Sequence, residues 1–366
     1  MSRQERVVIL VDFDYFFAQC EEVRNPALKE KPVVVGVYSG RTEDSGAVST
    51  ANYVARKFGV KSGISLYLAK KKLELADAVF LPVDFEFYEH ISDRIMSILE
   101  GYADVFEQVG IDEAFLDVTE KTDGSFEVAH HLAKKMKEEV ENEVGIAFSV
   151  GLGPNKLVAK IAADSQKPNG LTIVRTEEVK QFLSPLPVDR LVGVGRKIAS
   201  KMAELGIKSI GDLADYSVQK LVHMFGKKLG VYFHNAANGT DDEPVKEKTE
   251  AMSISRIATL KENTCDLLTV LERANQLIMD VHKELVHREL DFKQVGIIAI
   301  MEDLRVRSRS KTLETHTDNI EVLKRTVREL FEKFLGESDM EIRRIGVKIS
   351  QFSKKRPDQR QLTSFF

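Results

Sequence analysis

The sequence predicts a multidomain protein that joins a mixed α/β unit, a small helical domain and a separate α+β domain. Its 366 residues exceed the usual size of one domain. Apolar patterns of strand and helix type alternate as far as residue 152. Short helices separated by glycines follow from about residue 175, and a β-α-β-β-α-β order runs over residues 252–351.

The first unit begins with an uninterrupted β-branched and aliphatic run at residues 7–11, which is typical of a strand buried on both faces. A helix over 15–24 should follow, with Asp14 available as its N-cap. The remaining pattern predicts strand 32–37, helix 50–58 before Gly59, helix 65–75, strand 79–82, helix 84–102, two strands within 105–118, helix 125–143 and strand 146–152.

The later segments differ in texture from the first unit. Residues 175–239 read as a small all-helical domain, and the polar stretch 240–250, which contains Pro244, reads as a linker. The α+β domain should comprise strand 252–260, helix 264–288, strands 292–301 and 304–313, helix 319–335 and strand 342–351. A basic tail from Ser353 should be disordered when alone.

Composition is that of an ordinary globular protein. Hydrophobic residues make up 43% of the chain, which argues against wholesale disorder. The net charge of −4 gives no sign of nucleic-acid binding. Two cysteines are too few for a disulfide framework, and no apolar run is long enough to cross a membrane. These features favour a cytoplasmic protein with no membrane partner.

Three acids are candidates for one metal site. Asp12 ends the buried strand, and Asp112 with Glu113 lies at a tight connection between two strands. If the fold brings these carboxylates together, their repulsion calls for a divalent cation, and hard oxygen ligands favour Mg²⁺. Such a site serves phosphoryl transfer with two ions. Alternatively, each acid is only a helix cap or a polar turn residue.

A rival interpretation of the first motif is a haloacid-dehalogenase-like phosphatase, which also opens with a buried strand and Asp-x-Asp. That family normally continues with a small Gly-Thr or Gly-Val turn, whereas Asp14 is followed by three aromatic residues, Tyr15, Phe16 and Phe17. The glycine pair at 151 and 153 hints at phosphate binding but lacks the Gly-Lys-Ser/Thr of a P-loop.

Four longer motifs follow one another along the chain. They are Val11-Asp12-Phe13-Asp14-Tyr15-Phe16-Phe17-Ala18-Gln19, Thr50-Ala51-Asn52-Tyr53-Val54-Ala55-Arg56-Lys57, Ile111-Asp112-Glu113-Ala114-Phe115-Leu116-Asp117, and Ala159-Lys160-Ile161-Ala162-Ala163-Asp164 with Lys167-Pro168-Asn169-Gly170. Together they resemble the Y-family translesion DNA polymerases, and the closest type is the archaeal and bacterial DNA polymerase IV. The resemblance extends over about residues 6–352.

The resemblance implies a right-hand polymerase that extends a primer with dNTPs, bypasses lesions at low fidelity, acts as a monomer and is recruited by a PCNA-type sliding clamp. The implied domains are a palm at 1–20 and 77–174, fingers at 21–76, a helical thumb at 175–239, a linker at 240–250, a little finger at 251–352 and a tail at 353–366. A catalytically idle, clamp-tethered DNA-binding factor on the same fold is the alternative.

The resemblance also implies roles for individual residues. Asp12, Asp112 and Glu113 become the metal carboxylates for two Mg²⁺ ions, with the backbone carbonyl of Phe13 as a further ligand. Tyr53, Arg56 and Lys167 match residues that contact the incoming triphosphate in the family. Phe17 matches the position of an aromatic steric gate, which excludes the ribose 2′-hydroxyl. Tyr53 and Arg56 are three residues apart on a predicted helix and so share a face. Gly110 stands where many relatives carry Ser.

Candidate DNA contacts lie outside the palm. Gly193 and Gly195 open a helix in a pattern that resembles a helix-hairpin-helix, which binds DNA phosphate through backbone N–H groups. Strand period 2 puts four cations on one face of the strand at 304–313, and two more alternate with apolar residues in the last strand. We expect one basic sheet face, with the other under the helices; the cations are Arg305, Arg307, Arg309, Lys311, Arg344 and Lys348. The alternative is a solvated edge strand that deters aggregation.

The last eight residues resemble a clamp-binding box. Gln359 and Leu362 stand at its first and fourth positions, and Phe365 and Phe366 end the chain. One helical turn would place these aliphatic and aromatic side chains on a common face. The tail is therefore the predicted contact with a PCNA-type sliding clamp.

Overall fold

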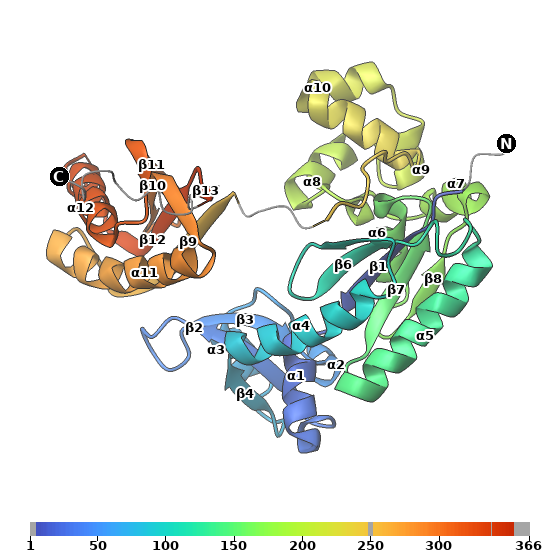
Figure 1. Cartoon of the computed structure of the whole chain (residues 1–366), viewed down its shortest axis with the longest axis horizontal. Helices are drawn as coiled ribbons and strands as arrows, with labels where there is room; N and C mark the ends of the chain where they lie inside the picture. Colours follow the sequence, from blue (N-terminus) through green and yellow to red (C-terminus); the bar gives the residue numbers. More distant parts are fainter. Residues whose placement is uncertain (1–4, 248–251, 338, 355–366) are drawn as a thin grey trace, which may run out of the picture. The chain divides into compact units, whose positions relative to one another are not determined.

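The structure is a computed structural model that describes residues 5–247, 252–337 and 339–354. The chain divides into two compact units: one of Met1–Gly36, Val48–Ile64 and Ala69–Thr249, and one of Val37–Ala47, Ser65–Leu68 and Glu250–Phe366. Figure 1 labels the helices and strands of both units. Within the described ranges, no helix is long and apolar enough to span a membrane.

The first unit is built on a sheet with strand order β5-β6-β1-β7-β8. Its central strand β1 pairs antiparallel with both neighbours, while β7 and β8 are parallel. Nearly every residue of β1 is buried, which confirms the prediction of a strand covered on both faces. The strands are β1 Val8–Phe13, β5 Val105–Gln108, β6 Glu113–Asp117, β7 Phe148–Gly153 and β8 Leu171–Ile173.

Helices cover both faces of this sheet. Ile9 and Val11 of β1 face a core shared with α1 Phe16–Arg24, α4 Phe85–Glu100 and α5 Phe126–Val144. On the other face, Val8 and Leu10 pack with α6 Lys156–Ser165, a helix that the sequence analysis did not predict. A Cβ atom at Gly151 of β7 would lie 2.0 Å from the carbonyl oxygen of Ala159 in α6. This glycine therefore permits close packing of helix on strand.

A smaller sheet has the order β3-β2-β4, with β2 Val33–Tyr38, β3 Gly46–Ala51 and β4 Val79–Pro82. The helix predicted over 50–58 is wrong in its first part, because β3 runs to Ala51 and only α2 Tyr53–Arg56 is helical. Asn52 makes this switch, since its side-chain oxygen accepts the N–H groups of both Ala55 and Val33. In the sequence, helix α3 Leu66–Lys72 lies between α2 and β4, and a 3₁₀ turn at Pro26–Leu28 lies between α1 and β2.

Residues 175–239 form a set of short helices, as predicted. These helices are α7 Val179–Leu183, α8 Arg196–Glu204, α9 Ile210–Ala214 and α10 Val218–Ala237, with 3₁₀ turns at Thr176–Glu178 and Val188–Arg190. Gly226 interrupts α10 with a φ of 80°, a conformation that glycine adopts without a steric penalty. The helices enclose a core that includes Leu191, Met202 and Phe233.

The second unit confirms the predicted β-α-β-β-α-β order. Its elements are β9 Ser253–Thr264, α11 Leu267–His287, β10 Leu290–Met301, β11 Val306–Thr317, α12 Ile320–Gly336 and β12 Ile342–Ser350. The strand order is β11-β10-β12-β9, and the short β13 Ser353–Lys354 pairs with β10. Apolar residues of α11 and α12 form one core with Val295, Ile297 and Ala299 of β10.

The register of β11 contradicts the prediction of a single basic face. Arg307, Arg309 and Lys311 lie directly opposite Ala299, Ile297 and Val295, and directly paired residues share a face. These cations therefore lie on the side that the helices cover, at the edge of the sheet.

Acids of α12 and the turn that follows it compensate two of these cations. Arg309 lies 3.2 Å from Glu337, and Lys311 lies 2.7 Å from Glu329. By contrast, Arg344 and Lys348 of β12 pair with Ile300 and Gly296 and are exposed on the open face. Alternation along a strand shows that its cations share a face, but it does not show which face the neighbouring strand presents to the helices.

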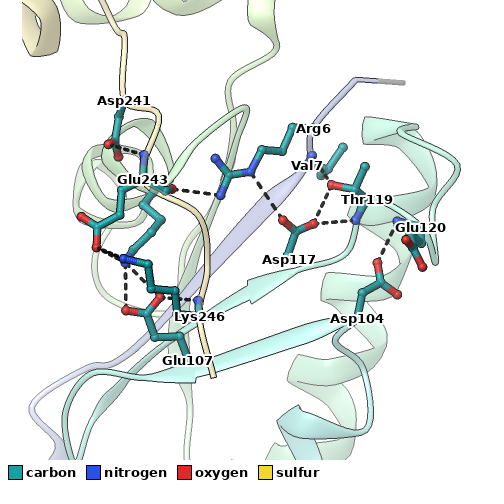
Figure 2. A network of polar contacts seen from close by, with 11 residues as sticks. Arg6, Val7, Asp104, Glu107, Asp117, Thr119, Glu120, Asp241, Glu243 and Lys246 are labelled. Carbon is teal, nitrogen blue, oxygen red and sulfur yellow. Dashed lines mark hydrogen bonds and ion pairs between the residues drawn. The ribbon is translucent and has the colours of Figure 1, made fainter. Parts of the chain in front are cut away.

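The described part of the predicted linker, residues 240–247, lies against the first sheet (Figure 2). Lys156 Nζ lies 2.9 Å from Glu107 Oε1 and 3.6 Å from Glu243 Oε1. The backbone N–H of Lys246 donates to Glu107 Oε2 at 3.0 Å, and Arg6 Nη2 donates to the carbonyl oxygen of Glu243 at 3.0 Å. Val245 is 6% exposed and packs with Val8, Leu10 and Phe115. This part of the segment is therefore a docked strap.

We expect Val245→Asp to release this strap. Burial of a valine side chain contributes about 2 kcal/mol, so its loss should raise the undocked population roughly 30-fold. Limited trypsin digestion would then cut after Lys246 faster in the variant than in the parent, while Asp242→Ala, at an exposed position, should match the parent. Equal cutting rates in Val245→Asp and the parent would show that the apolar contact does not hold the strap.

Candidate active site

A cavity of about 370 Å³ opens at the end of β1 in the first unit. Its lining brings together most of the residues that the sequence analysis selected for catalysis and nucleotide binding, namely Asp12, Phe13, Phe17, Tyr53, Arg56, Asp112 and Lys167. Glu113 does not line it. Residues not predicted also contribute, namely Asp14, Tyr15, Phe16, Ser49, Thr50 and Ser62.

The three predicted acids lie together at one end of the central strands β1 and β6. The antiparallel register pairs Asp12 with Glu113, and the N–H of Phe13 donates to the carbonyl oxygen of Asp112 at 2.8 Å. The side chain of Glu113 binds Lys160, and that of Asp12 binds Lys167. Among the residues that the structure describes, no group of three His, Cys, Asp or Glu side chains converges as a metal-binding cluster.

Burial makes ionisation of two of these acids unfavourable. It raises the pKa of Asp12 from 3.8 to about 6, although Lys167 opposes the shift. Burial also raises the pKa of Asp112, and the charge of Glu113 adds to this. A divalent cation would remove both penalties by neutralising the carboxylates, and their oxygens are the hard ligands that Mg²⁺ prefers. The donor set therefore fits a divalent metal.

Lys167 is held between two carboxylates. Its Nζ lies 2.7 Å from Asp12 Oδ2 and 2.8 Å from Asp164 Oδ1. Burial alone would lower the pKa of Lys167, but the two acids outweigh burial and raise it. The ammonium is thus charged, half-buried and placed at the wall of the cavity.

Tyr53 and Arg56 lie on one face of α2, as predicted. The Arg56 guanidinium carbon is 4.7 Å from the centre of the Tyr53 ring, and Arg56 Nε donates to the carbonyl oxygen of Ala51 at 2.9 Å. Tyr15 packs edge-on against Tyr53 at 5.3 Å between ring centres. The sequence analysis missed Tyr15, because its left-handed φ of 39° cannot be inferred from residue type.

Phe17 presents its ring to the same cavity. It stacks on Tyr88 of α4 with ring centres 4.5 Å apart and planes inclined by 17°. The Tyr88 hydroxyl donates to Glu21 of α1 at 2.7 Å, so the supporting ring is fixed in turn. Ser49 and Thr50 line the cavity from β3. Thr50 is the first residue of one of the motifs that carry the family resemblance. Its place in that motif was the one feature of the sequence that could have predicted its position in the cavity.

The remaining predicted site residues lie elsewhere. Gly193 has a φ of 87°, and Gly195 is the N-cap of α8. Arg305 precedes β11 and lies 3.1 Å from Asp303. The clamp-binding box, from Gln359 to Phe366, lies outside the described residues.

Three family models match the chain. Residues 11–164 match the impB/mucB/samB family, and residues 251–364 match the C-terminal domain of the same family. Residues 189–241 match a model described as the DNA polymerase-iota thumb domain.

Curated relatives extend this match over the whole length. DNA polymerase IV of Nitrosopumilus maritimus is 45% identical over 99% of this chain and 100% of its own. The chain belongs to the Y family of DNA polymerases, DNA polymerase IV type. DNA polymerase IV of Metallosphaera sedula is 42% identical over 95% of this chain and 97% of its own. The Y-family polymerase is therefore a DNA-directed DNA polymerase, an enzyme of translesion synthesis and repair.

Solved structures agree with this assignment and with the right-hand fold. A Y-family chimera titled Dbh-Dpo4(243-245)-Dbh superposes with a TM-score of 0.90 at 40% identity, covering 95% of this chain and 100% of the chimera. The insertion ternary complex of Dbh DNA polymerase gives a TM-score of 0.70 at 39% identity, with 95% and 100% covered. The Y-family polymerase thus has a palm, fingers, a helical thumb and a little finger.

Protons and divalent cations should compete for Asp12. Between pH 3.8 and about 6, the folded, metal-free protein keeps a proton on Asp12 that the unfolded chain has released, because the pKa is raised in the fold. The protonated carboxyl therefore stabilises the fold below this pH range, and that stabilisation is lost as the pH rises through it. We expect the rise in unfolding temperature caused by Mg²⁺ to grow from about pH 5 to about pH 7 and then level off.

The matched variants are Asp12→Asn, which should lose this pH dependence, and Asp93→Asn, at an exposed position of α4, which should keep it. An Mg²⁺ effect that Asp12→Asn leaves intact would contradict a role for Asp12 in holding the cation.

Proposed function

We propose that this Y-family polymerase extends a primer 3′-hydroxyl with dNTPs by two-metal nucleotidyl transfer. The observation that carries the proposal is the shared cavity, because Asp12 and Asp112 line it together with Tyr53, Arg56 and Lys167. One cavity is therefore lined both by carboxylates that can bind a cation and by groups that can bind a polyphosphate. This pairing suits Mg²⁺-dependent phosphoryl transfer.

The metal ligands would be Asp12, Asp112, Glu113 and the backbone carbonyl of Phe13. Two Mg²⁺ ions bound there would lower the pKa of the attacking hydroxyl and neutralise charge on the triphosphate. Glu113 is held by Lys160 in this structure, so its carboxylate would exchange that partner for the metal. Asp12 would do the same with Lys167.

The triphosphate would bind Tyr53, Arg56 and Lys167. A hydroxyl and a guanidinium on one face of α2 offer directed hydrogen bonds to phosphate oxygens. Lys167, once released from Asp12, supplies a mobile point charge to the same anion. Exchange of the Asp12 carboxylate for phosphate keeps the ammonium paired in both states.

Phe17 would act as the steric gate. Because Tyr88 backs its ring, the phenyl group cannot easily retreat from a ribose 2′-hydroxyl. Small residues in the fingers, such as Val37, Gly46 and Ala47, would by family analogy loosen the fit of the nascent pair and lower fidelity during lesion bypass. The alternative of an idle DNA-binding factor is not favoured, since the carboxylates and the phosphate-binding groups are all present.

We propose DNA contacts on the thumb and little finger and a clamp contact on the tail. Gly193 and Gly195 would offer backbone N–H groups to phosphate at the start of α8. On the little finger, Arg344 and Lys348 would contact phosphate from the open face, and Arg305, Arg307, Arg309 and Lys311 from the edge. Gln359, Leu362, Phe365 and Phe366 would bind a PCNA-type clamp. The polymerase would be a cytoplasmic monomer.

Primer extension tests the proposed chemistry. Asp112→Ala should reduce dNTP insertion by about 1,000-fold in the presence of Mg²⁺, because several kcal/mol of transition-state charge stabilisation would be lost. Affinity for primer-template DNA, measured without Mg²⁺ by fluorescence anisotropy, should change little. Undiminished extension by Asp112→Ala would overturn the two-metal proposal, and Asp93→Asn is the matched control.

Sugar discrimination tests the gate. Phe17→Ala should lower the preference for dNTPs over rNTPs roughly 100-fold, since the clash with the 2′-hydroxyl is removed while the contacts to dNTP remain. The measurement is the ratio of kcat/KM for one dNTP and its matching rNTP. Phe58→Ala, which removes an exposed ring outside the cavity, should keep the parent ratio. If Phe17→Ala also keeps it, Phe17 is only a packing residue.

A further inference from the structure

Asp14 does not cap α1. The N-cap residue is Tyr15, which makes no side-chain capping bond, so the predicted role of Asp14 is wrong. Asp14 is 2% exposed, and its carboxylate accepts the Ser149 hydroxyl, which lies 3.0 Å from Oδ1 and 2.9 Å from Oδ2. Oδ2 also accepts the backbone N–H of Asn169 at 2.7 Å. A buried carboxylate is costly without such partners, and here they all come from β7 and from the loop after α6.

That loop carries Lys167. It connects α6 to β8 over residues 166–170 and closes tightly, because a Cβ atom at Gly170 would lie 2.1 Å from the carbonyl oxygen of Gln166. Asn169 adopts a left-handed φ of 53°, which asparagine tolerates better than most residues. The Asn169 N–H bond to Asp14 therefore fixes the loop two residues beyond Lys167.

A second group, Lys137, holds the same loop through the same residue, Asn169. Lys137 of α5 donates to Asn169 Oδ1 at 2.6 Å and to the carbonyl oxygen of Phe148. Burial lowers the pKa of Lys137 to about 8, and the charge of Asp14 opposes the shift. Gln19 fixes Asp14 itself, since Gln19 Nε2 donates to the Asp14 carbonyl oxygen and to that of Ala147. The anchor thus joins the segment after β1 to α1, α5 and β7.

We propose that Asp14 is a positioning residue that anchors the 166–170 loop and thereby sets the reach of Lys167 between Asp12 and the triphosphate. This inference rests on the proposed contact of Lys167 with the nucleotide. A lysine ammonium ends a flexible four-carbon stem, so its position depends on where its backbone is fixed. Asp14 fixes that backbone from the motif that also supplies Asp12.

Two variants separate anchoring from mere charge. Asp14→Ala removes every acceptor and leaves the Asn169 N–H unpaired. Asp14→Asn keeps an oxygen for Asn169 and offers an NH₂ group to the Ser149 hydroxyl, but removes the charge. Ser165→Ala, at the exposed end of α6 and with no contact to Asp14, is the matched control.

The first measurement is hydrogen–deuterium exchange of the backbone amides of the loop itself, residues 166–170, in the full chain. We expect faster exchange in Asp14→Ala and parent-like exchange in Asp14→Asn and Ser165→Ala. Unchanged exchange in Asp14→Ala would overturn the anchor, whatever the nucleotide contacts prove to be.

The second measurement is steady-state dNTP insertion, with kcat and KM reported separately. Asp14→Ala should raise KM for dNTP roughly tenfold, and Asp14→Asn at most about threefold, since a displaced binding group weakens ground-state contact with the nucleotide. In the Lys167→Ala background the further loss from Asp14→Ala should vanish, because the residue being positioned is gone.

The outcomes are distinguishable. Equal losses in Asp14→Ala and Asp14→Asn would assign the effect to charge at the metal site and overturn positioning. If Asp14→Ala raises KM for dNTP as much in the Lys167→Ala background as in the parent, Asp14 does not act through Lys167, and the positioning role is also overturned. If Lys167→Ala alone leaves KM for dNTP unchanged, the proposed phosphate contact fails, and the exchange data still decide whether Asp14 anchors the loop.

Discussion

The antiparallel ladder of β6, β1 and β7 is the constraint on which the site depends. In this register Asp12 lies opposite Glu113 on β6 and opposite Ser149 on β7. The same backbone hydrogen bonds therefore fix the position of a proposed metal ligand, Glu113, and of Ser149, which binds Asp14. A shift of one residue would turn every side chain of β1 to the other face. Because β1 is apolar on both faces, its register depends on how its side chains fit the cores on the two sides of the sheet rather than on hydrophobicity alone.

Lysines balance the acids that this ladder concentrates. Lys167 and Lys160 bind Asp12 and Glu113. In the proposed mechanism a metal ion would replace each lysine at its carboxylate, and a phosphate would replace Asp12 at Lys167. Compact, hydrated ammonium groups on flexible stems suit such an exchange better than the rigid fork of arginine. The site is therefore stable as a set of ion pairs and open to replacement of its partners.

Sequence reasoning predicted what depends on local pattern or on a long motif. The run before Asp12 indicated β1, and the motifs placed Phe17, Tyr53 and Arg56 near one another, as the cavity shows. It failed where tertiary contacts override local preference. Asp14 is a residue type that often caps helices, and it directly precedes the predicted helix. Its carboxylate instead binds Ser149 and Asn169, which are distant in sequence. The docked strap likewise has the composition of a linker, because Val245 is its one buried apolar residue.

The ion pairs at the edge of the little finger have a thermodynamic consequence. DNA releases condensed counterions in proportion to the phosphates that a protein neutralises, and this release sets how steeply affinity falls with salt. To contact phosphate as proposed, Arg309 and Lys311 would first leave Glu337 and Glu329, whose vacated carboxylates would then lie near the DNA. These carboxylates would offset the two cations, so the pairs would add little to the net neutralisation of phosphate. The salt dependence of DNA affinity should therefore follow Arg344 and Lys348 more closely than the total number of cations on the domain.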